Sequence, residues 1–208
     1  MCTNDALYEK ECMHYIKRLQ IPTGFEAEML TIKQAESMTA GYNQAMNQSD
    51  AKYKVYLHQD VFIVYEHFLT ELLNIFQDDT IGMIGIVGSL DIEESSVIWY
   101  SDRVGMLYAN SVYKADSYLF GEITGKWKEV NAVDGLLMAT QYDLPWREDL
   151  FHHWDFYDLS QSMEFCRRGY KIVVPFTDKP LCINDDGILN INNYYKERSV
   201  YLKEYGNK

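Results

Sequence analysis

Short clusters of polar side chains follow strand-like segments of this sequence, and chemistry is expected at these clusters. They are Thr3-Asn4-Asp5, His58-Gln59-Asp60, Asp134-Gly135 and Asn184-Asp185-Asp186. In open parallel α/β sheets, ligands bind beyond the carboxyl ends of the strands, so side chains at these positions indicate a ligand site. A carboxylate there can hold Mg²⁺ or Mn²⁺ while water and substrate phosphates fill the other positions of the metal.

Each candidate also has a structural interpretation. Asp60 suits either a metal ligand or a turn residue that caps the next segment, and spacing favours neither. His58 could contact a metal or a phosphate, but a lone histidine at a strand end is more often a hydrogen-bonded structural residue. Asp134 interrupts an apolar run and must find a partner or line a pocket. Asp158 begins a predicted helix, where position alone favours N-capping.

Strand and helix patterns alternate among the elements that must position these residues. Strand patterns cover residues 25–31, 53–58, 80–89, 130–140 and 171–174, and helical patterns cover 6–19, 38–48, 65–77, 158–168 and 192–205. Residues 91–128 contain short β-prone pieces, at 97–100 and 105–108, and we expect an irregular insertion there. This order predicts a single α/β domain over residues 1–208, with a mostly parallel central sheet flanked by helices. Because little apolar sequence precedes Thr3, we expect the first strand to begin upstream of Met1.

Composition restricts the partners. The chain has 208 residues, 47% of them hydrophobic, which is enough for one substantial core. Its formal net charge of -12 argues against a nucleic acid or an anionic lipid surface as partner. The four cysteines show no metal-type spacing, so we expect reduced and mostly buried thiols in a cytoplasm. No apolar run reaches the ~18 residues of a membrane span, so membrane association is expected only through a complex, and an oligomer stays open.

The order of four segments resembles the family-two-type glycosyltransferases of the A fold, particularly a bacterial branch described as glycosyltransferase-like. The segments are HQDV, DDTIGMIGIVGS, VDGLLMATQYDLPWRED and FYDLSQSMEFCRRGYKIVVP. The resemblance covers nearly the whole chain from Thr3. It implies a nucleotide-diphospho-sugar transferase fold, a nucleotide-diphosphate sugar as donor, and Mn²⁺ or Mg²⁺ as cofactor. It also implies a glycan or other hydroxyl acceptor and a role in bacterial surface-glycan synthesis.

The resemblance also gives roles to individual residues. Asp60 matches the last aspartate of the metal-binding DxD motif, with His58 and Gln59 in its other positions. Asp158 matches the general base of inverting members, and this replaces the capping interpretation. The remaining matches concern the donor pocket: Thr3, Asn4 and Asp5 at the nucleotide-contacting end of the first strand, Asn43 on the helix before the strand that ends in the DxD position, and Asp134 and Gly135 on the acceptor side.

Three positions depart from the family pattern. His58 replaces the first DxD aspartate, Tyr157 replaces the glutamate before Asp158, and Asn184 stands where a histidine is expected. These departures favour an alternative, a non-catalytic relative that binds a nucleotide sugar or acts as a scaffold. A third interpretation is a metal-dependent phosphohydrolase or nucleotidyltransferase that uses Asp60 and Asp185-Asp186.

Overall fold

The computed structural model describes residues 1–92, 96–110, 114–185 and 191–206. Helices and strands alternate along the chain, which confirms the α/β class. The helices are α1 (Ala6–Ile16), α2 (Met38–Asn47), α3 (Phe68–Ile75), α4 (Tyr157–Arg167) and α5 (Tyr194–Tyr205), with a 3₁₀ turn η1 (Ile98–Tyr100). The strands are β1 (Cys2–Thr3), β2 (Ile32–Lys33), β3 (Lys54–Leu57), β4 (Val61–Ile63), β5 (Ile81–Gly85), β6 (Val87–Ser89), β7 (Arg103–Asn110), β8 (Ala115–Phe120), β9 (Trp127–Val130), β10 (Ala132–Val133), β11 (Leu137–Thr140), β12 (Lys171–Pro175) and β13 (Cys182–Asn184).

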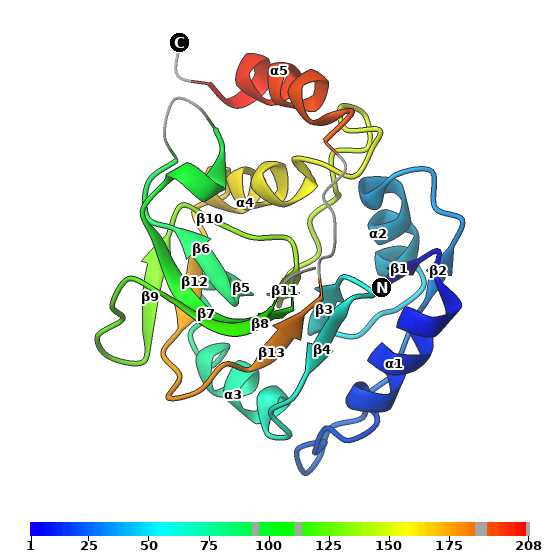
Figure 1. The fold of residues 1–208 in the computed structure, drawn as a ribbon, viewed down its shortest axis with the longest axis vertical. Helices are drawn as coiled ribbons and strands as arrows, with labels where there is room; N and C mark the ends of the chain where they lie inside the picture. The colour runs from blue at the N-terminus through cyan, green and yellow to red at the C-terminus, as the bar shows by residue number, and fades with distance from the viewer. Residues whose placement is uncertain (93–95, 111–113, 186–190, 207–208) are drawn as a thin grey trace.

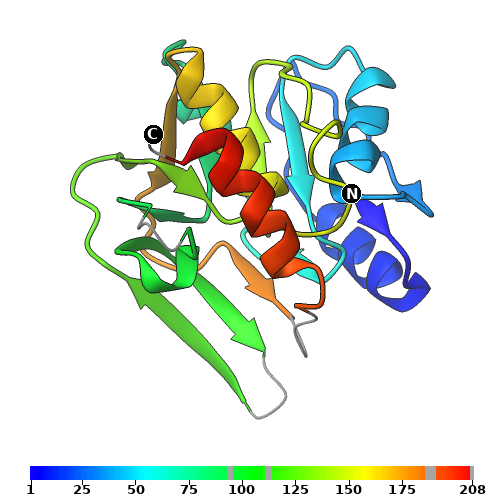
Figure 2. The ribbon, with the colours of Figure 1, turned by 90° about the horizontal axis from the view of Figure 1, so that it is seen from above.

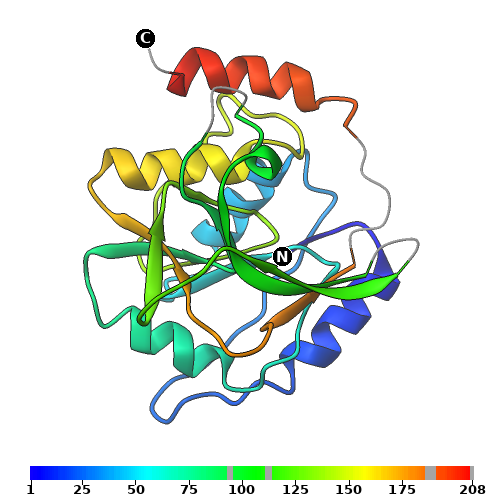
Figure 3. The ribbon, with the colours of Figure 1, turned by 60° about the vertical axis from the view of Figure 1, so that its left-hand side comes forward.

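The helices lie in layers on the two sides of the sheets (Figures 1 and 3). Helices α1 and α3 lie on one side, α2 and α4 lie on the other, and α5 lies across the outside of α4. The ribbon of β7 and β8 extends away from these layers (Figure 2). The sheets therefore form the middle of the molecule, with helices supplying the second wall of each core.

Strand β5 serves the cores on both sides. Ile84 belongs to one cluster of buried side chains, together with Phe68 of α3, whereas Met83 belongs to another, together with Tyr42 of α2. Successive side chains of a strand point to opposite faces, so an almost uniformly apolar run fits a strand covered on both sides. Residues 81–85 are all buried, as the strand prediction for this run requires.

The pairing of the strands corrects the expectation of a mostly parallel sheet. The five-stranded sheet has the order β3-β11-β5-β12-β9, and the six-stranded sheet contains β10-β6-β7-β13-β4 with β8 paired to β7. Among the described residues only β1–β2, β5–β12 and β7–β13 are parallel pairs. The run 130–140 is the cause of one difference, because it turns at Asp134-Gly135 and returns as β11, antiparallel to both β3 and β5.

Other predicted elements need correction as well. Residues 25–31 form no strand, and Phe25 is 47% exposed, although Met29 packs against a core cluster. The run 80–89 is divided at Ile86 into β5 and β6, which belong to different sheets. The piece at 97–100 forms η1, and the expected irregular insertion contains the regular β7–β8 ribbon. Apolar content identified extended segments, but it could not show where a sheet partner is available.

Capping residues fix the starts of the two helices nearest the N-terminus. The Asp5 carboxylate accepts hydrogen bonds from the N–H groups of Leu7 and Tyr8, and Ser37 Oγ accepts one from Ala40 N–H. Such caps satisfy N–H groups that have no partner inside the helix. Three cysteines are buried and Cys166 is exposed, with no disulfide among the four. None of the helices in the described part of the chain is long and apolar enough to cross a bilayer.

Candidate functional site

Two turns at the ends of neighbouring strands form the centre of the candidate site. One turn contains His58-Gln59-Asp60 between β3 and β4, and the other contains Asp134-Gly135 between β10 and β11. The antiparallel pairing of β3 and β11 sets them side by side, and His58 N–H donates to the carbonyl of Leu136 at 3.0 Å. Two of the predicted polar clusters therefore meet, although more than 70 residues of sequence separate them.

Gln59 joins the first turn to the end of β1. Its Oε1 atom accepts hydrogen bonds from Thr3 Oγ1 at 2.9 Å and from the N–H groups of Asn4 and Asp5 at 3.0 and 3.1 Å. Its Nε2 atom donates to Asn4 Oδ1 at 2.7 Å. The structure thus brings these predicted nucleotide-contacting residues together, with the backbone donors before α1 already paired to a side chain.

Asp158 lies in the first turn of α4, directly over the second turn. Gly135 N–H donates to Asp158 Oδ2 at 3.0 Å, and Leu159 N–H donates to Asp158 Oδ1 at 2.8 Å. Burial, followed by the negative charge of Asp134, raises the pKa of Asp158 to about 7, against the opposite effect of the two N–H groups. A carboxyl group with this pKa changes charge near neutral pH, which suits a general acid or base.

The backbone before Asp158 is strained. Phe156 has φ of +58°, in the left-handed region that costs a non-glycine residue roughly 1–2 kcal/mol. Its buried ring packs against Tyr194 and Tyr201 of α5, with ring centroids 4.9 and 5.4 Å apart. Helix α5 therefore holds the conformation that presents Asp158, and strain of this kind is concentrated at functional sites.

Tyr157 connects both turns to α4. Its hydroxyl group forms a hydrogen bond with His58 Nε2, and burial raises its pKa well above 10, so it stays protonated. A Cβ atom on Gly135 would lie 2.0 Å from this hydroxyl oxygen, so the tyrosine fits only against a glycine. The other ring nitrogen of His58 is 3.8 Å from Asp60 Oδ1. Two positions that depart from the family pattern are thus bonded to each other.

Two oxygen atoms at the start of the β4–β13 ladder fit a divalent cation. Asp60 Oδ1 and Asn184 Oδ1 are buried and accept no hydrogen bond from the described residues. The strands bring them to the same end of the ladder, where Asp185 N–H donates to the Asp60 carbonyl at 2.9 Å. Mg²⁺ and Mn²⁺ favour oxygen ligands and need only one or two from the protein. Three or more His, Cys, Asp or Glu side chains arranged as a metal site do not occur in the described ranges.

Sequence reasoning missed two residues that support this end of the ladder. Tyr8 of α1 donates to Asp185 Oδ2 at 3.0 Å, and Asn110 of β7 donates to Asp185 Oδ1 at 2.7 Å. The position of Tyr8, one helical turn before the buried Cys12, could have marked it as facing the sheet. Asn110 gives no such signal, and Asp186 lies outside the described residues.

Asn43 has a different role in the structure. Its side chain donates to the Trp146 carbonyl at 2.9 Å and accepts from Trp146 N–H at 2.8 Å, so its amide is fully used by one backbone unit. The Trp146 ring is 2% exposed and packs with Tyr42, Tyr56 and Tyr157. Asn43 therefore fixes the loop before α4, and its predicted nucleotide contact stays a prediction.

A pocket of about 140 Å³ opens beside the first turn. It is lined by Cys2, Thr3, Asn4, Met38, His58, Gln59, Asp60 and Trp154. Trp154 is 46% exposed and provides a ring face on its wall. The pocket is smaller than the 300–1,000 Å³ or so of typical small-ligand sites. A nucleotide sugar would need the Gln59 side chain or the neighbouring loops to move.

Comparisons with known proteins show a family and a similar fold. The model of a family described as "Glycosyltransferase like family" matches residues 1–205. The streptomycin biosynthesis protein StrF of Streptomyces griseus is 31% identical over 102 residues, which are 47% of this chain and 34% of StrF. A mannosyltransferase of Pyrobaculum calidifontis, solved in complex with GDP-Man and Mn²⁺, has a similar fold with a TM-score of 0.60 and 13% identity. That match covers 100% of this chain and 63% of the mannosyltransferase.

Proposed function

This chain belongs to the glycosyltransferase-like family, and from that premise we propose that it transfers a sugar from a nucleotide-diphosphate donor to an acceptor hydroxyl group. The observation that carries the proposal is the meeting of the Asp60 turn with the Asp158 carboxylate through Gly135. Following the resemblance, we propose an inverting reaction in the cytoplasm, serving bacterial surface-glycan synthesis. Related folds host different chemistries, so the site carries the proposal and the fold only supports it.

Asp60 is the proposed metal ligand, with Asn184 as a second oxygen donor. A bound Mn²⁺ or Mg²⁺ would neutralise the diphosphate leaving group, where negative charge grows in the transition state. The unpaired Oδ1 atoms of both residues support this role. Tyr8 and Asn110 hold the neighbouring Asp185 carboxylate, so they keep the ladder end in place.

Asp158 is the proposed general base. It would take the proton of the acceptor hydroxyl as that oxygen attacks the anomeric carbon, and the nucleotide diphosphate would leave from the opposite face. A single displacement of this kind inverts the configuration at the anomeric carbon. The pKa of about 7 keeps a useful fraction of Asp158 ionised at neutral pH while leaving it basic enough to accept a proton.

His58 and Tyr157 are proposed as positioning residues. Their hydrogen bond joins the turn that carries Asp60 to the helix that carries Asp158. Catalysis needs the leaving-group side and the base side in a fixed relation, because small displacements of reacting groups cost rate. In this chain a histidine–tyrosine pair would supply that connection in place of two acidic side chains.

A second candidate is a relative that binds its partner without catalysis. The hydrogen bonds of Gln59 favour it, because they use the N–H groups before α1 that would otherwise face a phosphate. The small pocket volume of about 140 Å³ also favours the non-catalytic candidate. This candidate predicts a stable fold that neither cleaves nor transfers a nucleotide sugar.

Calorimetric titration of nucleotide diphosphates tests the donor site that sugar transfer requires. GDP, UDP, dTDP and CDP would each be added with and without Mn²⁺, and GDP comes first because the mannosyltransferase of similar fold was solved with GDP-Man and Mn²⁺. We expect one of them to bind only with the metal, and Asp60→Ala to abolish that binding. Failure of all four, with the protein shown to be folded, would leave the non-catalytic candidate.

A further inference from the structure

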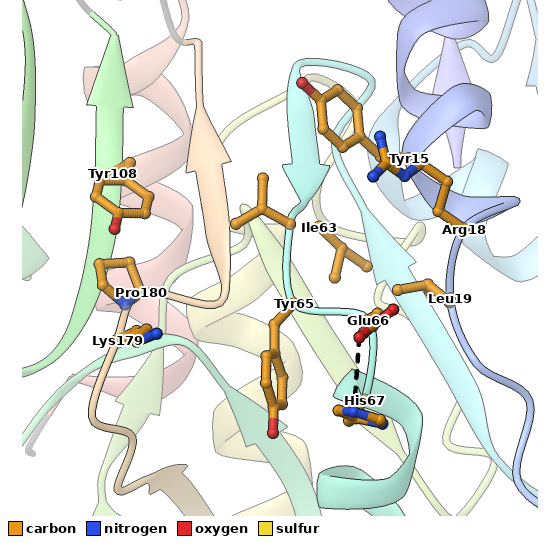
Figure 4. A pocket seen from close by; sticks show the side chains of 11 residues that line it. Tyr15, Arg18, Leu19, Ile63, Tyr65, Glu66, His67, Tyr108, Lys179 and Pro180 are labelled. Atoms are coloured by element: carbon orange, nitrogen blue, oxygen red, sulfur yellow. Dashed lines mark ion pairs between the residues drawn. The ribbon is translucent and has the colours of Figure 1, made fainter.

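A second and larger groove lies at the other end of β4, away from Asp60 (Figure 4). Its volume is about 570 Å³, within the range of small-molecule sites. The floor is formed around Ile63, with α1 on one side and the segment before β13 on the other. Strand β4 has three residues, so Val61 and Ile63 are about 7 Å apart, and among the described residues the groove shares no lining residue with the pocket beside Asp60. The groove is therefore distinct from the site at Asp60.

The walls of the groove are held by backbone hydrogen bonds. Gln20 N–H, just after α1, donates to the Glu66 carbonyl at 2.8 Å, and Val64 N–H donates to the Leu181 carbonyl at 2.9 Å. These bonds connect all three segments that surround the floor. A site whose walls are already fixed loses little conformational entropy when a ligand enters, so the groove is suited to binding as it stands.

Two cations face each other across the groove. Arg18 lies on the α1 side and Lys179 on the side of the segment before β13 (Figure 4). Neither side chain has an ion pair or hydrogen bond with the residues that the structure describes. The Glu66 carboxylate also lines the groove and is 3.7 Å from His67. The charge of Arg18 is stabilised by the negative C-terminal end of α1, whereas no helix end in the described ranges stabilises the charge of Lys179.

The charge of these two groove residues is opposite to the net charge of the chain. The whole chain has a formal net charge of -12, yet two cations without partners line one groove. An anionic group placed between them would interact with both, and its attraction would be stronger in a groove than on an open surface. The groove thus selects for a ligand with negative charge.

Tyrosine rings in the groove indicate the chemistry of the rest of the ligand. Tyr15, Tyr65 and Tyr108 line the groove, and Tyr108 is 38% exposed. The Tyr15 ring is stacked on Phe62 at 5.4 Å, which fixes its orientation. Tyrosine offers an apolar face and a hydroxyl group together, which matches a sugar ring with its apolar face and its hydroxyl edges.

From these features we propose that the groove binds a sugar that carries a carboxylate or phosphate group. The anionic group lies between Arg18 and Lys179, and the sugar ring lies against Tyr108 or Tyr15. In the part of the chain that the structure describes, the groove and the pocket beside the Asp60 turn share no lining residue, so the proposed binding does not use that turn. Binding here is therefore independent of whether the chain transfers sugars.

Titration followed by NMR of the backbone amides tests the proposal. The probes are glucuronic acid, glucose 6-phosphate, glucose and inorganic phosphate, and the reporters are the amides of Leu19, Ile63 and Val64. We expect one or both anionic sugars to shift these amides with saturation, and glucose and phosphate to bind at least about tenfold more weakly. The two anionic sugars distinguish carboxylate from phosphate as the favoured group.

Variants locate the binding and separate it from the proposed transfer site. Arg18→Ala with Lys179→Ala should weaken binding about tenfold or more, whereas Lys10→Ala, which removes an exposed charge from the same helix, should not. Asp60→Ala should leave it unchanged. Equal binding of glucose, equal binding of phosphate alone, or no saturable shift in the groove would each overturn the proposal. Unchanged thermal unfolding of each variant shows that the fold is intact.

Discussion

The Asp158 carboxyl group must lose its proton before it can act as a base, and its pKa of about 7 sets where this happens. Sugar transfer should therefore rise with pH through about 7 and then level off. Asp158→Asn should lower transfer by roughly 10²–10⁴-fold, the usual effect of a general base, while nucleotide binding stays within about twofold. Initial rates from pH 5.5 to 9 test this, with Asp155→Asn as the matched control. A normal rate in Asp158→Asn would remove the residue from the mechanism.

The same carboxyl group makes stability depend on pH. Its pKa is raised from 3.8 to about 7 on folding, so the folded state favours the protonated form. This stabilisation is complete below about pH 4 and is lost as pH rises through about 7. The loss should be at most about 4 kcal/mol, because one pKa unit corresponds to about 1.4 kcal/mol. Urea unfolding at pH 5 and pH 8 measures it, and Asp158→Asn should reduce the difference between the two values.

The hydrogen bond between His58 and Tyr157 can be tested by a double-mutant cycle. Tyr157→Phe and His58→Ala should each lower kcat more than they raise KM, because the pair positions groups and does not bind the donor. The double variant should be less impaired than the sum of the two, with a coupling of about 0.5–3 kcal/mol. Additive effects would show that the two side chains act separately.

Residue types and strand-end positions were enough to identify Asp60 and Gly135 as candidates, and the family resemblance added Asp158, but neither could find the partners of these residues. Gln59 pairs with Thr3 and Asn4 across more than 50 residues of sequence, and Tyr8 pairs with Asp185 across 177. Such contacts depend on sheet order, which residue spacing does not contain. The roles of these residues in metal binding and catalysis stay predictions.

At the scale of elements, an ionic cluster fastens α5 to α4. Glu164 of α4 is 8% exposed and accepts hydrogen bonds from Arg147, Arg167 and Arg168, and from the hydroxyl group of Tyr205 in α5. The pKa of Glu164 is lowered by these partners although burial opposes the shift. The cluster keeps α5 against α4, and α5 in turn supplies the rings that seat Phe156.

Removing the Glu164 carboxylate should therefore destabilise the fold and disturb the candidate site. We expect Glu164→Ala to lower the free energy of unfolding by about 1–3 kcal/mol, because it removes the carboxylate that three guanidinium groups share and takes away the ion pair of Arg168. Glu148→Ala, an exposed glutamate in the preceding loop, is the matched control and should change it by less than about 0.5 kcal/mol. Chemical denaturation measures both. Equal stability of the two variants would show that the cluster does not stabilise the fold.

Helices were predicted better than strands, for a physical reason. The amphipathic pattern of 65–77 and the apolar positions of 158–168 each report one face of one helix; α3 lies within the first range, and α4 differs from the second by one residue at each end. A strand is defined by its neighbours, so 25–31 had the composition of a strand and no partner. The run 130–140 was likewise predicted as one strand, although Asp-Gly pairs favour turns and the turn at Asp134-Gly135 divides the run.

At the scale of the whole molecule, the prediction that residues 1–208 form one domain can be measured. Side chains of β5 and β12 belong to the cores on both sides of the sheet, so no part would lose its structure alone. Calorimetry should show one unfolding transition whose van't Hoff enthalpy equals the calorimetric enthalpy. Two transitions, or an enthalpy ratio well away from one, would show separate units.

The packing of Phe156 against α5 affects when the site can form during protein synthesis. The first polar cluster is at Thr3, whereas the rings that hold the strained residue come from Tyr194 and Tyr201. A nascent chain that has emerged only as far as α4 can pair most of its strands, but it has nothing to hold Asp158 in place. Helix α5 must leave the ribosome before Asp158 is positioned for the proposed transfer. Unfinished chains would therefore not consume nucleotide sugar.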